Sequence, residues 1–478
     1  MMKSLYRSLA ITGCVAVVLA AVFFALLLGF SRNVPDASSD NSMIFTASEP
    51  AEISSVLVEN ASGKYRFYYE GDGYVLDDIP TDIADLDAFI NFMVNCGNLS
   101  AARRVTGVQA EDYGLTEPAA VVEIRFFNGR AQRITIGARE TISGGYYVEA
   151  EGFPGVFLMD ALMAELFLRP KTQVIDMRVT PALAMSSPLS AVRDIMFSGG
   201  ALTRPVAISA VSGGDEWVRL AALSFGAATH IMRETGVYPL DQTYGADIFG
   251  SLFNIEMLEV EGYNLTAAEL AAMGFDAPWM TVEFDAMNGA GAEAVHYILR
   301  LVRGDNDTFL INLNNGNVVF RIGWQPFMDV QYEKLPSRWF LTPMLKDLSA
   351  ITIECEDLRY RFEIDNADPK NPVIMSEGSM LDTQLFRSFF RLVTSAAHDG
   401  AYLGIMEQPE NEALLTVTYE YFAPGKKPDV LALYPGGVRR VNVFVNGAGE
   451  FAMKDTFVSR VLEGCRCLIA GEPIEENW

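Results

Sequence analysis

The side chains best suited to acid–base or metal chemistry are few and scattered in this sequence. Its 478 residues include three histidines, His230, His296 and His398. No histidine stands in an HExxH pattern or has an HxE partner, the spacings that bring zinc ligands and a catalytic glutamate together. We therefore expect each histidine to be an ordinary surface or half-buried side chain.

The five cysteines include one closely spaced pair, Cys465 and Cys467. Thiols two residues apart can bond to each other only in a strained ring, and a metal ion would require further ligands. Cys96 and Cys355 lie far away in the sequence, and outside the cytoplasm disulfide pairing is allowed but not required. We interpret Cys465 and Cys467 as buried or free thiols in the last element of the chain.

Two acidic segments, Asp305–Asp307 and Asp365–Asp368, resemble fragments of calcium-binding loops. An EF-hand loop needs oxygen ligands at alternate positions and a glycine at the sixth position. Counted from Asp365, the third position is Ala367 and the sixth is Lys370. We interpret both segments as polar turns, with weak ion binding as the alternative.

Other signatures of catalysis are absent from the sequence. It contains no G-x-S-x-G nucleophile motif, no Walker A loop and no G-x-G-x-x-G loop. With 61 acidic residues, two carboxylates at the separation found in glycosidase active sites must occur by chance. Such a pair would therefore not indicate glycosidase activity. We expect no catalytic, cofactor-binding or metal-binding residues and no enzyme activity, so any energy must come from a partner.

Composition limits the class of protein. Half of the residues are hydrophobic, which rules out wholesale disorder, and the length suits about three domains. With 36 basic and 61 acidic residues the net charge is −25. A chain this acidic repels phosphate backbones, so we expect no nucleic-acid partner.

The amino-terminal segment Leu9–Phe30 has 22 residues without a charge. A helix of that length spans about 33 Å, enough for the hydrocarbon core of a bilayer. Lys3 and Arg7 precede it, so the positive-inside rule places the short amino end in the cytoplasm and the rest outside. A cleaved signal peptide is the alternative, although its apolar core is usually shorter. Lipidation at Cys14 is rejected because the apolar run follows this cysteine.

We predict a cytoplasmic stub and anchor at residues 1–32 and a flexible linker at residues 33–51. Lys3, Arg7 and Arg32 flank the anchor. The rest of the chain then has 33 of the 36 basic residues and all 61 acidic residues. Such an acidic body should not lie flat on anionic lipid. The linker prediction rests on its small and polar composition.

The body of the sequence repeats itself. Three segments begin apolar-Ser-small-β-branched: Ile53–Val58, Leu189–Ile195 and Leu348–Ile353. Gly114 and Pro118 frame a turn before a strand, and Gly274 and Pro278 do so again 160 residues later. We predict three divergent tandem units at residues 52–188, 189–347 and 348–478. In each Gly-x-x-x-Pro segment we expect the glycine to adopt positive φ for a structural reason.

Each unit shows short alternating strands around one amphipathic helix. The first helix is predicted at Asp82–Cys96, capped by Asp82, with Ile83, Leu86, Phe89, Ile90 and Met93 on its apolar stripe. The others are predicted at Ala246–Met257 and Leu381–Ala397, with short closing helices at Ala161–Leu168 and Thr456–Gly464. The fold class expected is α+β: an N-terminal transmembrane helix followed by three repeats of antiparallel sheet plus amphipathic helix.

The first unit resembles a bacterial family known as domain of unknown function 4340. The resemblance rests on Tyr113–Pro118, Thr135–Gly137, Gly145–Val148 and Val156–Leu158, and it covers roughly residues 74–179. It weakens in the second unit, and the third unit lacks the glycine motif. The resemblance implies a membrane-anchored envelope protein of a kind often encoded beside gliding-motility-type ABC transporters. The family has no established catalytic residues to transfer to this sequence.

Two classes of function remain. The first is a membrane-anchored extracytoplasmic accessory or scaffold protein, with the bilayer as partner through residues 9–30 and an ABC transporter permease or ATPase as protein partner. The second is an envelope module that binds or senses a peptide, glycan or cation. An aromatic face around Tyr65, Tyr68, Tyr146 and Tyr147 would serve the second class.

Overall fold

The structure is a computed structural model that describes residues 42–106, 113–211, 228–233, 238–287, 289 and 291–478. The predicted anchor at residues 9–30, with Cys14, and the stub before it lie outside the described residues. The chain divides into two compact units, Met1–Asp176 and Met177–Trp478. Among the helices that the structure describes, none combines the length and apolar character needed to cross a bilayer.

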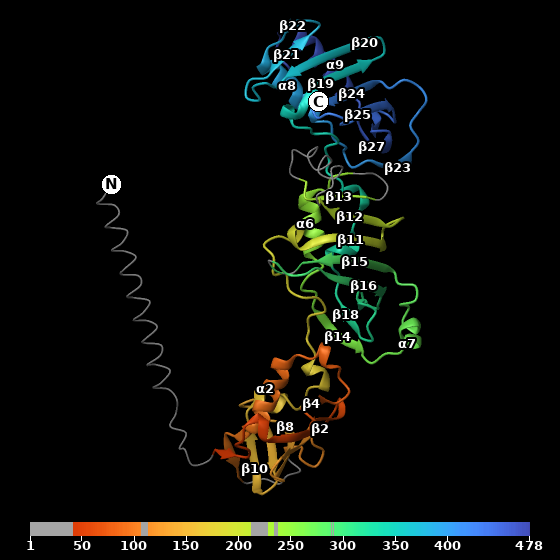
Figure 1. Cartoon of the computed structure of the whole chain (residues 1–478). Helices are drawn as coiled ribbons and strands as arrows, with labels where there is room; N and C mark the ends of the chain where they lie inside the picture. The colour runs from red at the N-terminus through yellow and green to blue at the C-terminus, as the bar shows by residue number, and fades with distance from the viewer. Residues whose placement is uncertain (1–41, 107–112, 212–227, 234–237, 288, 290) are drawn as a thin grey trace, which may run out of the picture. The chain divides into compact units, whose positions relative to one another are not determined.

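Antiparallel sheets dominate the described part of the chain (Figure 1). Three sheets have eight, eight and nine strands, and a fourth, small sheet pairs β1 (Met43–Ile44) with β5 (Ser100–Ala101). Sheet 1 belongs to the first unit, whereas sheets 2 and 3 belong to the second. The fold is therefore mixed α+β, built from repeated antiparallel sheets.

The strands follow one another in space from edge to edge of each sheet. Sheet 1 comprises β4 (Gly73–Leu76), β3 (Gly63–Glu70), β2 (Ile53–Asn60), β7 (Ala120–Phe126), β8 (Ala131–Arg139), β9 (Tyr146–Ala150), β10 (Phe153–Met159) and β6 (Arg103–Val105). Sheet 2 comprises β13 (His230–Met232), β12 (Val206–Ala210), β11 (Val192–Gly199), β15 (Met280–Ala286), β16 (Val295–Arg303), β17 (Phe309–Leu313), β18 (Val319–Ile322) and β14 (Met257–Gly262). Sheet 3 comprises β22 (Ser379–Met380), β21 (Val373–Ser376), β20 (Leu358–Asp365), β19 (Leu348–Cys355), β24 (Leu415–Tyr421), β25 (Asp429–Pro435), β26 (Arg440–Val445), β27 (Ala448–Lys454) and β23 (Tyr402–Met406).

All three sheets follow the same path. The opening strand of each sheet lies in its interior, between the second strand and the strand that begins the later meander. The strand after the helix crosses to the far edge, where β6, β14 and β23 occupy equivalent positions. Sheet 3 adds only the short β22. This shared order confirms the prediction of repeated antiparallel sheets.

One helix connects the two halves of each sheet. These helices are α2 (Leu86–Gly97), α6 (Gln242–Gly250) and α8 (Thr383–Thr394). In sheet 1 the rings of Phe89 and Phe92 meet Phe67 of β3 edge to face, with centroids 5.6 and 5.4 Å apart. In sheet 3 the equivalent contacts join Phe362 of β20 to Phe386 and Phe389. These aromatic contacts stabilise each helix on its sheet.

The remaining α-helices in the described part of the chain are short except at the carboxyl end. They are α3 (Ala161–Glu165), α4 (Pro188–Ala191), α7 (Ala267–Ala272) and α9 (Thr456–Ala470). The long α9 packs beside α8. It extends beyond the predicted Thr456–Gly464, whereas α3 is shorter than the predicted Ala161–Leu168.

Two predicted helix starts are wrong, and α8 is shorter than the predicted Leu381–Ala397. The first helix is capped by Asp85, which accepts a hydrogen bond from the Ala88 amide at 3.0 Å, whereas Asp82 lies in a preceding single turn. The second helix is Gln242–Gly250 rather than Ala246–Met257, because Asp241 caps it from an earlier position. Apolar periodicity identified both helices but did not determine which acidic residue begins them.

Two other predictions require correction. The opening strand of sheet 2 begins at Val192, and the segment Leu189–Ala191 lies in α4. Part of the predicted linker at residues 33–51 is also packed: Met43–Ile44 form β1, and Phe45 is buried between Phe153 and Phe157. The described residues of the predicted linker therefore belong to the first compact unit.

The Gly-x-x-x-Pro segments have the backbone that the sequence predicts. Gly114 and Gly274 have φ of +71° and +95°. A Cβ at Gly114 would stand 3.0 Å from the Ala138 backbone nitrogen, so both conformation and space favour glycine. The following strands, β7 and β15, begin two residues after each proline.

Candidate functional site

The three histidines lie in separate places. His230 is buried in β13, with Nε2 2.9 Å from the Val192 carbonyl oxygen, and burial lowers its pKa. His296 is exposed on β16, with Nδ1 2.7 Å from Asp285 Oδ1. Within the described residues, no three His, Cys, Asp or Glu side chains are grouped to hold a metal ion.

The cysteines in the described part of the chain, Cys96, Cys355, Cys465 and Cys467, are free thiols, as predicted for the last two. Both lie in α9, where residues two apart point in different directions, so Cys465 is buried and Cys467 is half-buried. Burial raises the pKa of the Cys96 and Cys465 thiols, which keeps them protonated and unreactive.

The two acidic segments are polar turns, as predicted. Asp305 accepts from Thr308 through its carbonyl oxygen, and Asn306 and Asp307 have positive φ. The Asp368 carboxylate accepts hydrogen bonds from the Lys370 amide and the Asn371 side chain. The side-chain contacts of Asp368 are typical of an Asx turn, whereas Asp305 forms an ordinary backbone turn.

The four tyrosines of the proposed aromatic face have different surroundings, and Tyr146 is half-buried with Arg139 5.9 Å from its ring centroid. Tyr65 of β3 is buried and its hydroxyl donates a 3.1 Å hydrogen bond to the Arg169 carbonyl oxygen. Tyr68 is half-buried under the Arg66 guanidinium, and Tyr147 packs on Tyr113 with centroids 4.3 Å apart. Tyr65 is therefore a core residue rather than part of a binding face.

A buried charge that the sequence did not reveal lies between sheets 2 and 3. Glu450 of β27 is 1% exposed. Its Oε1 lies 2.9 Å from Nη2 of Arg204, which follows β11 of sheet 2. Its Oε2 accepts a 2.6 Å hydrogen bond from the Tyr332 hydroxyl, and Arg204 also contacts the hydroxyl of Tyr402. We call Arg204, Tyr332, Tyr402 and Glu450 the Glu450 cluster.

Aromatic rings enclose the Glu450 cluster. Phe451 stacks parallel to Tyr332 at 6.4 Å and meets Tyr238 edge to face at 5.7 Å. Arg204 lies over the ring of Tyr332, 5.0 Å from its centroid. Burial, followed by the nearby Glu450 charge, raises the pKa of Tyr238, which stays a neutral phenol. The Glu450 carboxylate is thus shielded from water, whereas Arg204 keeps partial exposure, and groups from both sheets satisfy the pair.

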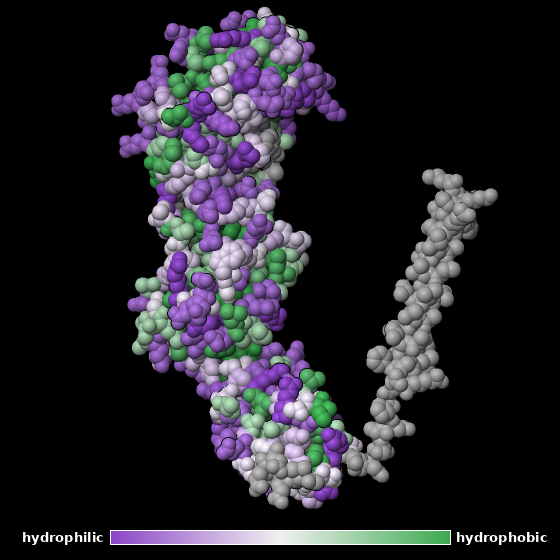
Figure 2. Space-filling view, turned by 180° about the vertical axis from the view of Figure 1, so that it is seen from behind, coloured by the Kyte–Doolittle hydropathy of each residue, from purple (hydrophilic) through white to green (hydrophobic). Residues whose placement is uncertain are grey.

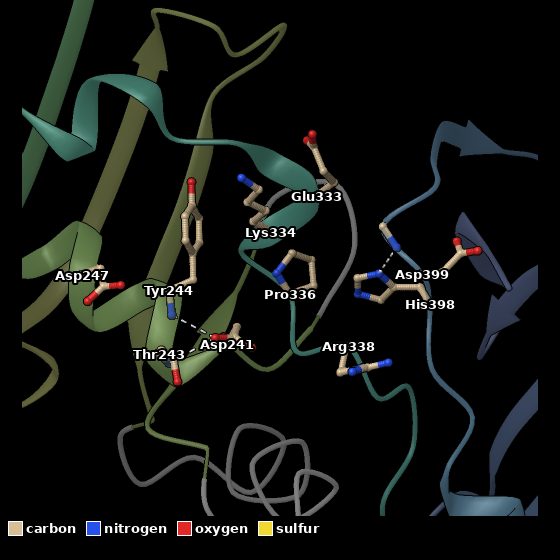
Figure 3. Close-up of a pocket in the computed structure, with 11 residues that line it drawn as sticks. Asp241, Thr243, Tyr244, Asp247, Glu333, Lys334, Pro336, Arg338, His398 and Asp399 are labelled. Atoms are coloured by element: carbon tan, nitrogen blue, oxygen red, sulfur yellow. Dashed lines mark hydrogen bonds between the residues drawn. The ribbon is translucent and has the colours of Figure 1, made fainter. Parts of the chain in front are cut away.

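A groove of about 600 Å³ lies beside this cluster. Figure 3 shows Asp241, Tyr244 and Asp247 projecting from α6 on one side, with His398 and Asp399 on the other. The segment that carries Glu333, Lys334, Pro336 and Arg338 lies between them. We call this the junction groove.

Charges of both signs line the junction groove. Asp241 caps α6, and Asp399 pairs with Arg440 at 2.7 Å. Asp247, Glu333 and Arg338 have no ion-pair partner among the described residues. Arg338 lies over the Trp339 ring, 5.5 Å from its centroid. The groove therefore combines two uncompensated carboxylates with a guanidinium.

His398 forms one wall of the junction groove. Its ring stacks on Phe451 at 4.4 Å, and its Nδ1 accepts a 3.2 Å hydrogen bond from the Gly400 amide (Figure 3). Nδ1 is therefore unprotonated and the neutral ring carries its proton on Nε2, which is buried near the Ser337 and Pro336 backbone without a well-formed hydrogen bond. Burial lowers the pKa of His398 most, and Arg338 lowers it further, whereas the Ser337 and Pro336 backbone and Asp399 raise it.

The searches for related proteins returned no matching family model, no matching curated protein and no matching solved structure. The family resemblance stated for the first unit therefore remains a prediction.

Proposed function

We propose that this chain is a membrane-anchored extracytoplasmic accessory or scaffold protein, without catalysis of its own, that docks on an ABC-type transporter. The observation that carries the proposal is the Glu450 cluster. A buried ion pair contributes little stability compared with apolar packing, but its geometry favours one specific arrangement of the groups that it joins. A scaffold needs neighbouring domains held in one arrangement, and this cluster supplies such a constraint between sheets 2 and 3.

The uncharged segment at residues 9–30 supplies the anchor in this proposal. Lys3 and Arg7 place the amino end in the cytoplasm, so the described sheets lie outside. This topology puts the sheets beside the extracytoplasmic parts of any membrane-embedded permease.

Sheet edges are the docking surfaces that we expect. Among the strands that the structure describes, the edge strand β23 of sheet 3 pairs only with β27, and its Leu403 and Ile405 side chains are exposed. An edge strand with free backbone groups and outward apolar side chains can accept an added strand from a partner. Strand addition at β23 is therefore the contact that we assign to the transporter.

Affinity isolation of the full-length tagged protein from native membranes in mild detergent tests this function. We expect stoichiometric recovery of a permease or ATPase subunit, identified by mass spectrometry. A control in which residues 1–32 are replaced by an unrelated anchor should recover the same subunit if the sheets make the contact. Recovery of the tagged protein alone, repeated after crosslinking, would refute the proposal.

A second candidate function is ligand binding in the junction groove. The observation that favours it is the pairing of uncompensated Asp247 and Glu333 with Arg338 beside the unpartnered Nε2 of His398. Groups of both signs suit a small zwitterion such as a peptide end. Calorimetric titration with short peptides should then show binding that Arg338→Gln abolishes. Arg303→Gln is the matched control, because Arg303 also lies over a tryptophan ring, that of Trp279.

A further inference from the structure

Helix α2 of the first unit has an apolar stripe that nothing in the described structure covers. Leu86, Ile90 and Val94 are 59%, 54% and 39% exposed. They are spaced four residues apart, so they form one line along the helix, beside the buried Phe89 and Met93. We call these three residues the α2 stripe.

The equivalent helices of the other two sheets provide an internal comparison. Each helix follows an aspartate cap, Asp85, Asp241 or Asp382, whose carboxylate accepts amide hydrogen bonds from the first turn. Counting from these caps aligns the core phenylalanines of α2 with those of α8. The positions of the α2 stripe are then occupied by Gln242, Ala246 and Gly250 in α6, and by Thr383, Arg387 and Arg391 in α8. The apolar stripe therefore belongs to the first unit alone.

The first unit is also the one that directly follows the predicted anchor. Only twelve residues separate Phe30 from β1, which begins at Met43. Fully extended, twelve residues reach about 40 Å, so the first unit must lie close to the bilayer if residues 9–30 span it.

The carboxyl end of α2 lies close in the chain to the partner of β1, the first strand that the structure describes. Ile44 of β1 is exposed, and it pairs with Ser100, three residues beyond the end of α2. Figure 2 shows hydrophobic residues among polar ones on the surface of this unit, the lowest described part of the chain in that view.

The charges on α2 suit a neutral surface. The helix contains no lysine or arginine, and its single acidic residue is Asp87 at the amino end. Uncharged Asn91 and Asn95 occupy the polar face beside the stripe. Binding would therefore depend on apolar contact rather than on attraction to anionic headgroups.

We infer that α2 lies against the outer surface of the bilayer, with Leu86, Ile90 and Val94 in the interfacial region. This inference rests on the anchor in the proposed function. Three side chains are a weak membrane contact alone, but an anchored domain experiences a high effective concentration of lipid. A second copy is a poorer occupant, because a stable interface needs about 800 Å² per partner, more than three such side chains provide.

The test places an environment-sensitive fluorophore at position 90 of the full-length protein in phosphatidylcholine vesicles. Ile90→Cys carries the label, and Arg387→Cys at the equivalent position of α8 is the matched control. Cys14, Cys355 and Cys467 are replaced by serine to suppress background labelling. We expect blue-shifted emission and several-fold weaker quenching by aqueous iodide at position 90 than at position 387. Adding Leu86→Gln and Val94→Gln should return the position 90 signal to the control value.

Carbonate extraction of the vesicles tests the anchor separately. If the protein resists extraction but emission and quenching are equal at positions 90 and 387, the inference is overturned and the anchor remains. A position 90 signal that grows with the ratio of protein to lipid would also overturn it, since the stripe then contacts a second copy. Extraction of the unlabelled protein by carbonate would instead refute the anchor, and with it both proposals. Vesicles containing phosphatidylglycerol should give no stronger signal than phosphatidylcholine alone.

Discussion

Replacing Arg204 by methionine is expected to weaken the junction between sheets 2 and 3 by about 3 kcal/mol. Removing one partner of a buried ion pair typically costs about 3–5 kcal/mol, because the other charge stays buried without compensation. Glu450 is fully enclosed, but the Arg204 side chain is 24% exposed, which places the effect at the lower end of this range. The Tyr332 hydroxyl continues to satisfy Oε2 of Glu450 and limits the loss.

Hydrogen-exchange mass spectrometry of the full-length protein measures this effect locally. Peptides that span Ala448–Lys454 should show an opening free energy lower by about 3 kcal/mol in Arg204→Met. The double variant Arg204→Met, Glu450→Gln should recover most of the loss, because a neutral amide is far less costly to leave buried than a carboxylate.

A matched control uses the more exposed bidentate pair of Arg361 and Glu420 in sheet 3. Arg361→Met should cost less than about 1 kcal/mol, as is typical of exposed ion pairs. If Arg204→Met costs no more than Arg361→Met, the Glu450 cluster does not hold the two sheets together. Failure of Glu450→Gln to recover the loss would show that a lost packing contact, rather than the buried charge, is responsible.

Three further outcomes follow from the structure. Burial lowers the pKa of His398 from its usual 6.5, so the stability that its neutral form contributes is present above pH 6.5 and is lost as the pH falls through the lowered pKa. The thermal unfolding temperature of a His398→Phe variant should therefore depend less on pH in that window. An unchanged pH profile would contradict this prediction. Gly114→Ala should destabilise the first unit by about 1–2 kcal/mol in urea unfolding, through positive φ and the close approach of Ala138, whereas a neutral effect would contradict the turn. Asp85→Ala should cost about 1 kcal/mol in the same assay and Asp82→Ala almost nothing; the reverse order would restore Asp82 as the cap.

The repeated sheets were predictable because they depend on local patterns. Alternating strands and glycine turns repeat along the sequence, and Gly114 and Gly274 need positive φ wherever the turn occurs. Helix starts were less predictable, since Asp82 and Asp85 lie within one turn of each other and either can cap. Only the geometry shows that Asp85 accepts the amide hydrogen bond.

The Glu450 cluster was not predictable from sequence. Arg204 and Glu450 are 246 residues apart, and neither belongs to a periodic or spaced pattern. The α2 stripe was misjudged for a related reason: periodicity places Leu86 and Ile90 on the apolar side of the helix, but only the packed structure shows that they lie outside the core.

The proposed docking on a transporter depends most directly on the edge strand β23. Affinity isolation from native membranes should be repeated with Leu403→Lys, Ile405→Lys in the full-length protein. Both side chains are exposed, so the variant should fold and insert like the wild type while recovering several-fold less of the transporter subunit. If the folded variant with both lysines in β23 recovers as much of that subunit as the wild type, docking through this strand is contradicted.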